Sequence, residues 1–425
     1  MRNIKLCVMR VVVIVLAAAF FYNTPRLLAF SQKDVKQVVQ DNGCKLLILE
    51  NHLNPTITVQ IFIKGGLLTQ DKPSAANFSL SILAGGTKKY SENEYYDKLD
   101  AMGAQASFAA NPDFSLITVR SLSSSGAAPL EFVLDGLKNP DFSKSKFRQI
   151  RERIRKNILR RANYPFNRAA DKLWAALFKG EKYEYPVVGT VETLSAVRVK
   201  DLKKYYRSLL SPENWVVVIS GDVTPGVLKQ IEGYLSRYKL FSKAGRGKIN
   251  YPLNAGAISD TTIILREKQG QDYVLMGMRY KYSDLKDYAG MKLLSKYLGG
   301  SAMESRLFMI LREKYGISYV ATAFFPTRVG PSLLGIYFDA LKGAADTGVR
   351  AVNEELDAIE EGNIDTRLLS DVRANTRNEF RVSLSNVSKY AWYLGFYEME
   401  TGDYKNLYRY PELVQNVPFI CRPIC

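Results

Sequence analysis

The chain has 425 residues, of which 47% are hydrophobic, and it carries a formal net charge of +17. This length allows two or three domains with their own cores, and the hydrophobic fraction excludes a disordered chain. The net charge predicts attraction to anionic surfaces or acidic peptides. The sequence contains no nucleic-acid-binding motif, and we expect no nucleic-acid partner.

The N-terminus has the pattern of an export signal. An apolar run from Val11 to Phe21 follows three basic residues, Arg2, Lys5 and Arg10. The run is short for a membrane span and has the length of a signal-peptide core. We therefore predict a signal peptide over residues 1–31 and a periplasmic location, with an uncleaved membrane anchor as the alternative. The four cysteines show neither metal-binding spacing nor a disulfide framework: Cys7, Cys44, Cys421 and Cys425.

A first domain is expected over residues 32–241. The alternation in Lys45–Glu50 and Thr56–Lys64 predicts two strands that pair with each other. A helix is expected to begin after Pro73 and to end at Gly85-Gly86. Ser91 with Glu94 three residues later has the form of a capping box for the next helix.

A hairpin and several helices follow. Residues 104–109 and 114–121 predict the hairpin, and residues 127–177 are helical apart from breaks at Pro140 and Pro165. The densest basic run of the chain lies on one of these helices: Lys144, Arg148, Arg151, Arg153, Arg155, Lys156, Arg160 and Arg161. Few aromatic residues interleave with these charges, so a solvated helix surface is the simplest interpretation. A further apolar strand is predicted over Val216–Ser220.

The second half of the sequence repeats the pattern of the first. After a basic linker over residues 242–257, the domain expected over 258–425 has a strand at Tyr273–Tyr280 and a helix at Tyr288–Leu298 that ends in Gly299-Gly300. Residues 317–324 and 332–338 then predict a second hairpin. The predicted fold class is α+β, with two homologous tandem domains, each an antiparallel β-sheet covered by α-helices.

The run SAANFSLSILAGGTKK, residues 74–89, resembles the zinc helix of the pitrilysin/insulinase family of zinc peptidases, the inverzincins. Members of that family carry His-x-x-Glu-His, followed by Gly-Thr and a basic pair, and use the histidines to bind zinc and the glutamate to activate water. Gly86-Thr87-Lys88-Lys89 matches the end of this pattern. Asn77 and Ser81 then stand where the resemblance implies histidines, and Leu80 stands where it implies the glutamate.

The remaining metal position is also altered. The resemblance implies a third ligand near Asn157, and the nearest carboxylate, Glu152, lies more than one helical turn away. His52 is the sole histidine of the chain. We therefore expect no zinc or other cofactor in this chain alone.

The resemblance implies that one part of the family's site is retained. Arg312 and Tyr319, in the stretch LREKYGISY, resemble the arginine and tyrosine that line the substrate cleft in this family. The resemblance implies that Arg312, near a helix end, and Tyr319, on the following strand, bind the peptide carbonyl and the developing oxyanion. The alternative is that Arg312 is a cation near a helix C-terminus and Tyr319 a half-buried aromatic.

The leading hypothesis is therefore a non-catalytic subunit of an exported heterodimeric zinc peptidase. Its zinc would be held by a paralogous partner chain, its substrate would be a peptide, and the basic surface also allows peripheral association with a membrane. Peptidase activity is expected with that partner and not in the lone chain. A structural or peptide-binding protein of the same fold is the alternative, and a hydrolase using Ser81 with His52 is the third hypothesis.

The end of the sequence departs from the family pattern. After Gln415-Asn416-Val417 the resemblance implies one more helix and strand, and the sequence has only PFICRPIC. We expect a shortened second domain with an exposed sheet edge.

Overall fold

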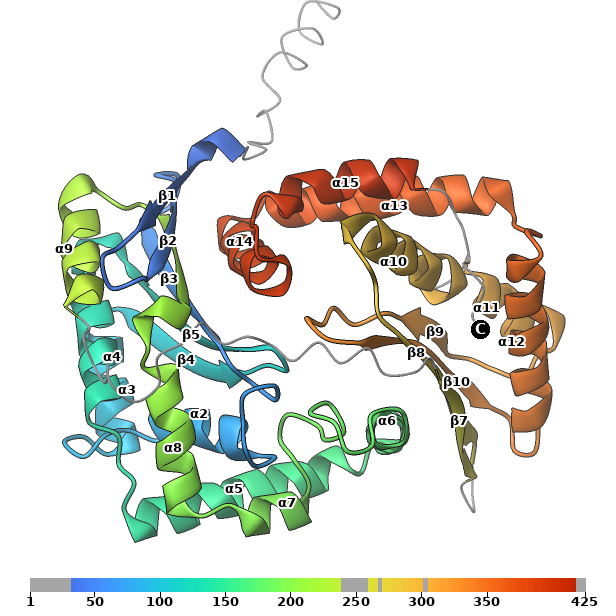
Figure 1. Cartoon of the computed structure of the whole chain (residues 1–425), viewed down its shortest axis with the longest axis horizontal. Coiled ribbons are helices and arrows are strands. Elements are labelled where there is room, and N and C mark those ends of the chain that lie inside the picture. The colour runs from blue at the N-terminus through green and yellow to red at the C-terminus, as the bar shows by residue number, and fades with distance from the viewer. Residues whose placement is uncertain (1–31, 238–258, 267–269, 301–304, 418–425) are drawn as a thin grey trace, which may run out of the picture.

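The computed structural model describes residues 32–237, 259–266, 270–300 and 305–417, and shows two β-sheets, each with its own helices (Figure 1). We call residues 32–237 the first half and residues 259–417 the second half. The predicted α+β class, with two similarly built units, is confirmed. The predicted signal peptide and most of the predicted linker lie outside the described residues.

The first half is built on a six-stranded sheet in the order β1-β2-β6-β3-β5-β4. Its strands are β1 (Val35–Val39), β2 (Lys45–Glu50), β3 (Thr56–Lys64), β4 (Ala104–Ala110), β5 (Phe114–Leu122) and β6 (Trp215–Gly221). The expected β4–β5 hairpin is confirmed. The predicted pairing of β2 with β3 is wrong, because β6 lies between them, parallel to β2 and antiparallel to β3. β6 is buried along its whole length, as expected for a central strand.

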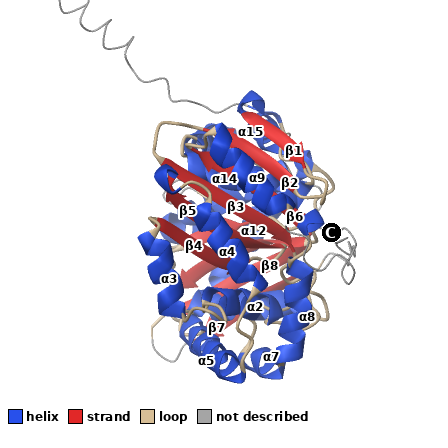
Figure 2. Cartoon of the chain, turned by 90° about the vertical axis from the view of Figure 1, so that its left-hand side faces the viewer, coloured by secondary structure: helices blue, strands red, loops and turns tan. Residues whose placement is uncertain are grey.

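Helices pack on one face of this sheet and beyond its end (Figure 2). α2 (Ala75–Ala84), α3 (Glu92–Ala101) and α4 (Ala128–Lys138) contact the strands, and α9 (Pro225–Ser236) packs beside α4. α5 (Lys144–Arg161) and α8 (Val199–Leu209) pack on α2, and α7 (Val191–Ala196) packs on α5. Short 3-10 turns lie at Gln32–Asp34, Ser123–Ser125 and Pro212–Asn214. The predicted capping box at Ser91 and Glu94 is present. Phe78 of α2 stacks on Phe147 of α5, with ring centroids 4.8 Å apart, and this contact joins the two helices in the core.

The second half has a four-stranded sheet in the order β7-β8-β10-β9. Its strands are β7 (Asp260–Arg266), β8 (Asp272–Tyr280), β9 (Ala321–Phe324) and β10 (Ser332–Ala340). Its helices are α10 (Leu285–Gly299), α11 (Arg306–Phe308), a π-helical turn over Met309–Lys314, α12 (Ala345–Glu360), α13 (Thr366–Leu384) and α15 (Asn406–Asn416). β7 pairs directly with β8, so no described strand takes the place that β6 has in the first sheet.

Strand β9 is shorter than predicted. It begins at Ala321 and leaves residues 317–320 outside the strand. The backbone N–H groups of Tyr319 and Val320 donate to Oδ1 of Asp339, at 2.9 and 2.8 Å. These donors are therefore bonded to a side chain and not to a neighbouring strand.

The two halves exchange one helix each (Figure 1). α6 (Pro165–Leu177) packs on β7 and β8 of the second sheet, and α14 (Val387–Thr401) packs on β2, β3 and β6 of the first sheet. Both contacts are close at a glycine. A Cβ added at Gly395 of α14 would lie 2.1 Å from the Phe62 ring, and one added at Gly277 of β8 would lie 2.6 Å from Leu173 of α6. The halves are therefore packed as one unit.

Within the described residues, no helix is both long and apolar enough to cross a membrane.

Candidate functional site

Helix α2 holds the three residues that we predicted at the metal positions of the resembled family. Asn77 and Ser81 lie one turn apart on the half-buried side of α2. Leu80 is 1% exposed and packs in the core of the first half. An amide, a hydroxyl and an aliphatic side chain supply none of the usual zinc ligands and no general base. The residues on α2 therefore do not fit a catalytic zinc ion.

Helix α5 does not supply the missing ligand. Asn157 is exposed, and its side-chain oxygen accepts a hydrogen bond of 3.2 Å from Arg160 on the same helix. Glu152 is also exposed and accepts three hydrogen bonds from Arg155, which hold the pKa of its carboxyl below the ordinary value. In the parts of the chain that the structure describes, no three His, Cys, Asp or Glu side chains are grouped so that they could hold a metal ion.

The sole histidine is engaged elsewhere. Nδ1 of His52 lies 2.6 Å from Oδ1 of Asp222, and the hydrogen bond with His52 lowers the pKa of that aspartate. His52 follows β2, and Asp222 follows β6. The structure therefore pairs His52 with Asp222 and not with Ser81 of α2.

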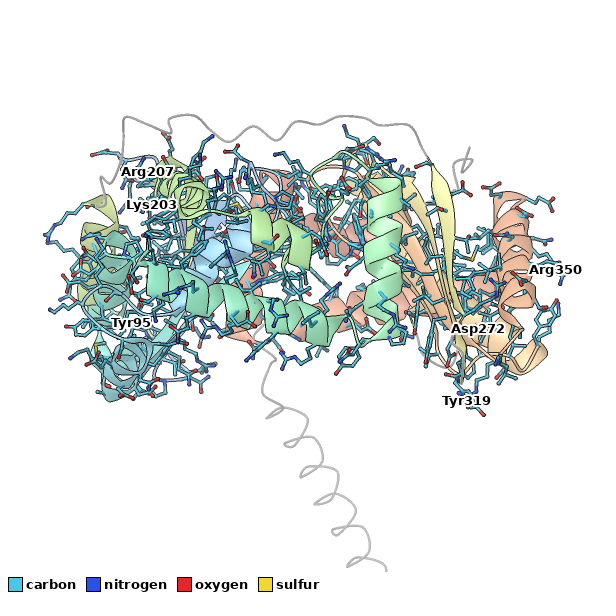
Figure 3. All side chains as sticks on the ribbon, turned by 90° about the horizontal axis from the view of Figure 1, so that it is seen from below. Tyr95, Lys203, Arg207, Asp272, Tyr319 and Arg350 are labelled. Carbon is cyan, nitrogen blue, oxygen red and sulfur yellow. The ribbon has the colours of Figure 1, made fainter. Side chains whose placement is uncertain are left out.

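Arg312 and Tyr319 are brought together in the second half. The Arg312 guanidinium lies 5.7 Å from the centroid of the Tyr319 ring and 5.0 Å from that of Phe308. Gly316 between them has a φ of 65°, so the chain can reverse there at low cost. Tyr319 is 67% exposed and lies at the outer edge of the second half (Figure 3). The guanidinium of Arg312 and the phenol ring of Tyr319 thus lie near each other and are both exposed to the solvent.

A buried carboxylate fixes the backbone beneath this pair. Asp339 is 6% exposed, and its Oδ1 accepts from the Ser318 hydroxyl at 2.8 Å as well as from two backbone N–H groups. We predicted Tyr319 on a strand, which is wrong because Asp339 binds this segment before β9 begins. The sequence signal for Asp339 was an acidic residue within an otherwise apolar strand, SLLGIYFDA.

Exposed apolar side chains surround the pair. Tyr315, Val320 and Leu341 are 37%, 52% and 48% exposed. The Leu341 N–H donates to the Ile317 carbonyl at 2.9 Å, so the end of β10 lies beside the loop that carries Tyr319. We call Arg312, Tyr315, Tyr319, Val320 and Leu341 the Arg312 patch.

Buried charges meet at the centre of the molecule, where the β4–β5 turn approaches the β9–β10 turn. Asp113 of the first turn accepts a hydrogen bond from the Tyr183 hydroxyl, which in turn accepts from the Gly330 N–H at 3.3 Å. The Arg328 guanidinium lies 5.8 Å from the Tyr183 ring. Burial raises the pKa of Asp113 to about 6. This cluster links the two halves.

Two more charged groups complete the cluster. Nζ of Lys292 on α10 donates to the Phe325 carbonyl at 2.6 Å, and burial lowers the pKa of that amine to about 8. Burial, reinforced by Asp113, raises the pKa of Glu400 at the end of α14 well above its ordinary value. Sequence reasoning missed this cluster, because its members are scattered along the chain and show no spacing motif.

A pocket of about 400 Å³ opens beside the cluster, between residues 68–73, residues 180–185 and Gly330-Pro331. Its charged groups are already partnered. Lys182 donates to the Gln70 carbonyl at 2.6 Å, and Glu181 binds Arg279 through two hydrogen bonds. The charged side chains that line the pocket therefore hold neighbouring segments of the two halves together.

Comparison with known proteins gives consistent matches. The model described as insulinase (peptidase family M16) matches residues 45–191, and the model described as peptidase M16 inactive domain matches residues 196–376. An uncharacterized zinc protease, YmxG of Bacillus subtilis, is 20% identical over 88% of this chain and 90% of its own length. A protein of Helicobacter pylori described as the non-peptidase homolog YmxG is 23% identical over 64% of this chain and 62% of its own length.

A similar fold is found among solved structures. The crystal structure of a protease from Helicobacter pylori aligns with a TM-score of 0.82 at 17% identity, over 91% of this chain and 94% of that chain. At 17% sequence identity, this similarity is evidence for a shared fold alone.

Proposed function

We propose that this chain, which belongs to the insulinase family of peptidases (peptidase family M16), is the non-catalytic subunit of an exported two-chain zinc peptidase. The single observation that carries the proposal is the contrast between two surfaces of one molecule. Helix α2 has Asn77, Leu80 and Ser81 at the metal positions, whereas Arg312 and Tyr319 lie together and exposed.

The chemistry assigned to Arg312 and Tyr319 follows from their donors. A guanidinium presents N–H groups in a fixed planar arrangement that suits a peptide carbonyl or carboxylate. A phenolic hydroxyl beside it can donate to an oxygen that gains negative charge during peptide cleavage. Both groups are exposed, so they could act only if a second chain covered them. That chain would bring its own zinc site, and the Arg312 patch would lie against it.

The proposal includes the cellular location. The apolar run at residues 11–21 supports export to the periplasm, where the partner would also be found. Fractionation of cells that express the chain, followed by sequencing of its N-terminus, tests this part. Recovery of the chain from the cytoplasm with an intact N-terminus would contradict it.

The decisive experiment reconstitutes the enzyme. The chain is purified alone and together with a zinc-bearing paralogue from the same genome, and hydrolysis of a fluorogenic peptide is measured. We expect activity in the pair and none in the lone chain. Arg312→Ala and Tyr319→Phe should each lower kcat/KM of the pair about 10²-fold.

Two controls distinguish a loss of catalytic activity from a loss of binding between the two chains. Lys314→Ala removes an exposed cation from the same π-helical turn and should leave kcat/KM within about threefold of the natural pair. Tyr319→Phe keeps the ring and removes only the hydroxyl, so the affinity between the two chains, measured by calorimetry, should not change. Chelator-sensitive cleavage by the lone chain would overturn the proposal, as would indifference of the pair to both substitutions. Recovery of the chain with envelope proteins and no peptidase would support the structural alternative.

A further inference from the structure

Helix α5 carries a charge imbalance that the proposed function does not use. Among its 18 residues one is acidic, Glu152, and nine are basic, at positions 144, 146, 148, 151, 153, 155, 156, 160 and 161. The helix runs along the outer surface of the first half (Figure 1). Its buried side is apolar, formed by Phe147, Ile150 and Ile154. The charges therefore lie on a helix that is firmly attached to the core.

Several of the basic groups have local structural roles. Lys146 and Arg151 donate to the carbonyls of Gly85 and Val197, at 2.8 and 2.6 Å. Arg153 pairs with Glu92 at 2.6 Å, and Arg161 pairs with Asp171. These bonds anchor the flanks of α5 to neighbouring elements.

The remaining cations form an outward row. Lys144, Arg148, Lys156 and Arg160 are exposed and lie at multiples of four residues from one another, so the row winds by about 40° at each step of four and spreads over the half of α5 that faces away from the core. In the part of the chain that the structure describes, none of the four forms an ion pair with an acidic side chain. Glu152, which lies in the same row, is bonded to Arg155.

The row ends in exposed apolar groups. Leu159 is 46% exposed and lies on the half of α5 that faces away from the core, and Tyr164 just beyond the helix is 62% exposed. An aliphatic and an aromatic side chain flanked by cations is the arrangement by which helices rest on an anionic lipid surface.

Helix α8 enlarges the basic surface. Its exposed Lys203 and Arg207 lie one turn apart and are labelled in Figure 3. Arg151 bonds α5 to the segment just before α8, through the carbonyl of Val197. α8 therefore adds two exposed cations to the same half of the molecule.

We propose that the α5 face, formed by Lys144, Arg148, Lys156, Leu159, Arg160 and Tyr164, is a docking surface for an anionic lipid membrane. The cations attract the headgroups, and Leu159 and Tyr164 enter the boundary between headgroups and acyl chains. A membrane accounts for both the charges and the apolar end, whereas an acidic polymer accounts only for the charges. The surface lies on the first half, apart from the Arg312 patch of the second half, so both surfaces can be occupied together.

The test compares charge-reversed variants of the full chain. Binding to phosphatidylcholine vesicles with and without phosphatidylglycerol is measured by co-sedimentation. The natural chain should bind the anionic vesicles and should lose most of this binding when the salt concentration rises from about 0.05 to about 0.3 M. The double variant Arg148→Glu/Lys156→Glu should weaken binding by about 100-fold or more.

A matched control alters the same net charge elsewhere. Arg350→Glu/Arg381→Glu reverses two exposed cations of α12 and α13, and Figure 3 places Arg350 at the far end of the second half. This control should change binding by less than about threefold. Circular dichroism and urea unfolding of all variants confirm that each is folded. Equal losses in the two double variants would show an effect of overall charge and overturn the proposal.

A third variant distinguishes a membrane from an acidic polymer. Leu159→Gln should weaken vesicle binding about three- to tenfold, because it removes apolar contact and no charge. The same variant should bind soluble polyglutamate as the natural chain does. If Leu159→Gln leaves vesicle binding unchanged and polyglutamate competes fully with the vesicles, the partner is an acidic polymer and the proposal is wrong.

Discussion

The substitution Gly395→Ala tests the exchange of helices between the halves. A Cβ at Gly395 would lie 2.1, 2.4 and 2.6 Å from three carbons of the Phe62 ring. Carbon atoms in contact are separated by about 3.5 to 4.0 Å, so the ring or α14 must move by about 1 Å or more. Phe62 is 0% exposed and its ring lies 5.3 Å from that of Phe114, so little room is left for this movement.

The expected loss of stability follows from two opposing effects. Overpacking of a dense core costs about 1 to 3 kcal/mol, and the steep overlap at Gly395 places this substitution at the upper end. Alanine is favoured over glycine inside a helix by about 1 kcal/mol, which offsets part of the cost. We therefore expect the free energy of unfolding in urea to fall by about 2 kcal/mol.

A control variant and a double-mutant cycle test whether the loss of stability arises from the contact between Gly395 and Phe62. Gly233→Ala on α9 meets nothing within 4 Å, and it should raise the free energy of unfolding by about 0.5 to 1 kcal/mol. Phe62→Leu combined with Gly395→Ala should show a coupling of about 1 kcal/mol or more, because the smaller side chain accepts the new methyl group. If Gly395→Ala stabilises the protein as Gly233→Ala does, α14 does not rest on the first sheet.

Three further predictions concern the buried charges and the metal. Glu181→Ala should lower the free energy of unfolding by about 2 kcal/mol or more, because it leaves Arg279 without its carboxylate partner. The side chain of Arg279 is 6% exposed, so water cannot replace that partner. A loss below about 0.5 kcal/mol in urea unfolding would contradict this prediction. Burial raises the pKa of Asp113 to about 6 in the folded chain. Between about pH 4 and pH 6 its carboxyl is therefore protonated in the folded chain and ionised in the unfolded chain. The stabilisation that comes from this difference is greatest in acid and is lost as the pH rises through 6. Asp113→Asn should therefore gain about 3 kcal/mol relative to the natural chain between about pH 4 and pH 7 in urea unfolding, and a difference independent of pH would refute the assignment. Added zinc should leave the Tm of the lone chain unchanged to within about 1 °C, whereas a rise that depends on zinc concentration would reveal a site that the described residues do not show.

The local elements were largely predictable from the sequence. The apolar spacing before Gly85-Gly86 predicted α2, and Ser91 with Glu94 predicted the capping box of α3. The alternation in residues 104–121 predicted the β4–β5 hairpin. These features depend on residues close together in the chain, where periodicity and capping preferences act directly.

The order of strands and the exchanged helices were not predictable in the same way. β6 lies between β2 and β3 although it is more than 150 residues away from them in the sequence. An alternating pattern predicts a strand but does not predict which strands pair with it. α14 shows apolar residues on most of its circumference, which indicates burial without saying against which sheet. Lys292 and Glu400 resembled solvated surface charges, because nothing near them in sequence marks them as buried.

At the candidate site, the family resemblance led us to Arg312 and Tyr319, and the structure places the two side chains near each other. Their role, and the assignment of Asn77, Leu80 and Ser81 to metal positions, stay predictions from that resemblance. The bonds from Ser318, Tyr319 and Val320 to Asp339 join residues about 20 apart through a reversal of the chain, so only the folded structure reveals them.

The most direct test of the account is the peptidase activity of the reconstituted pair with Tyr319→Phe in this chain. We predict that the two chains associate with unchanged affinity and that kcat/KM falls about 10²-fold, because one hydroxyl donor is lost from the shared site. Unchanged kcat/KM in a fully assembled pair would contradict the claim that this subunit contributes Tyr319 to the site of its partner.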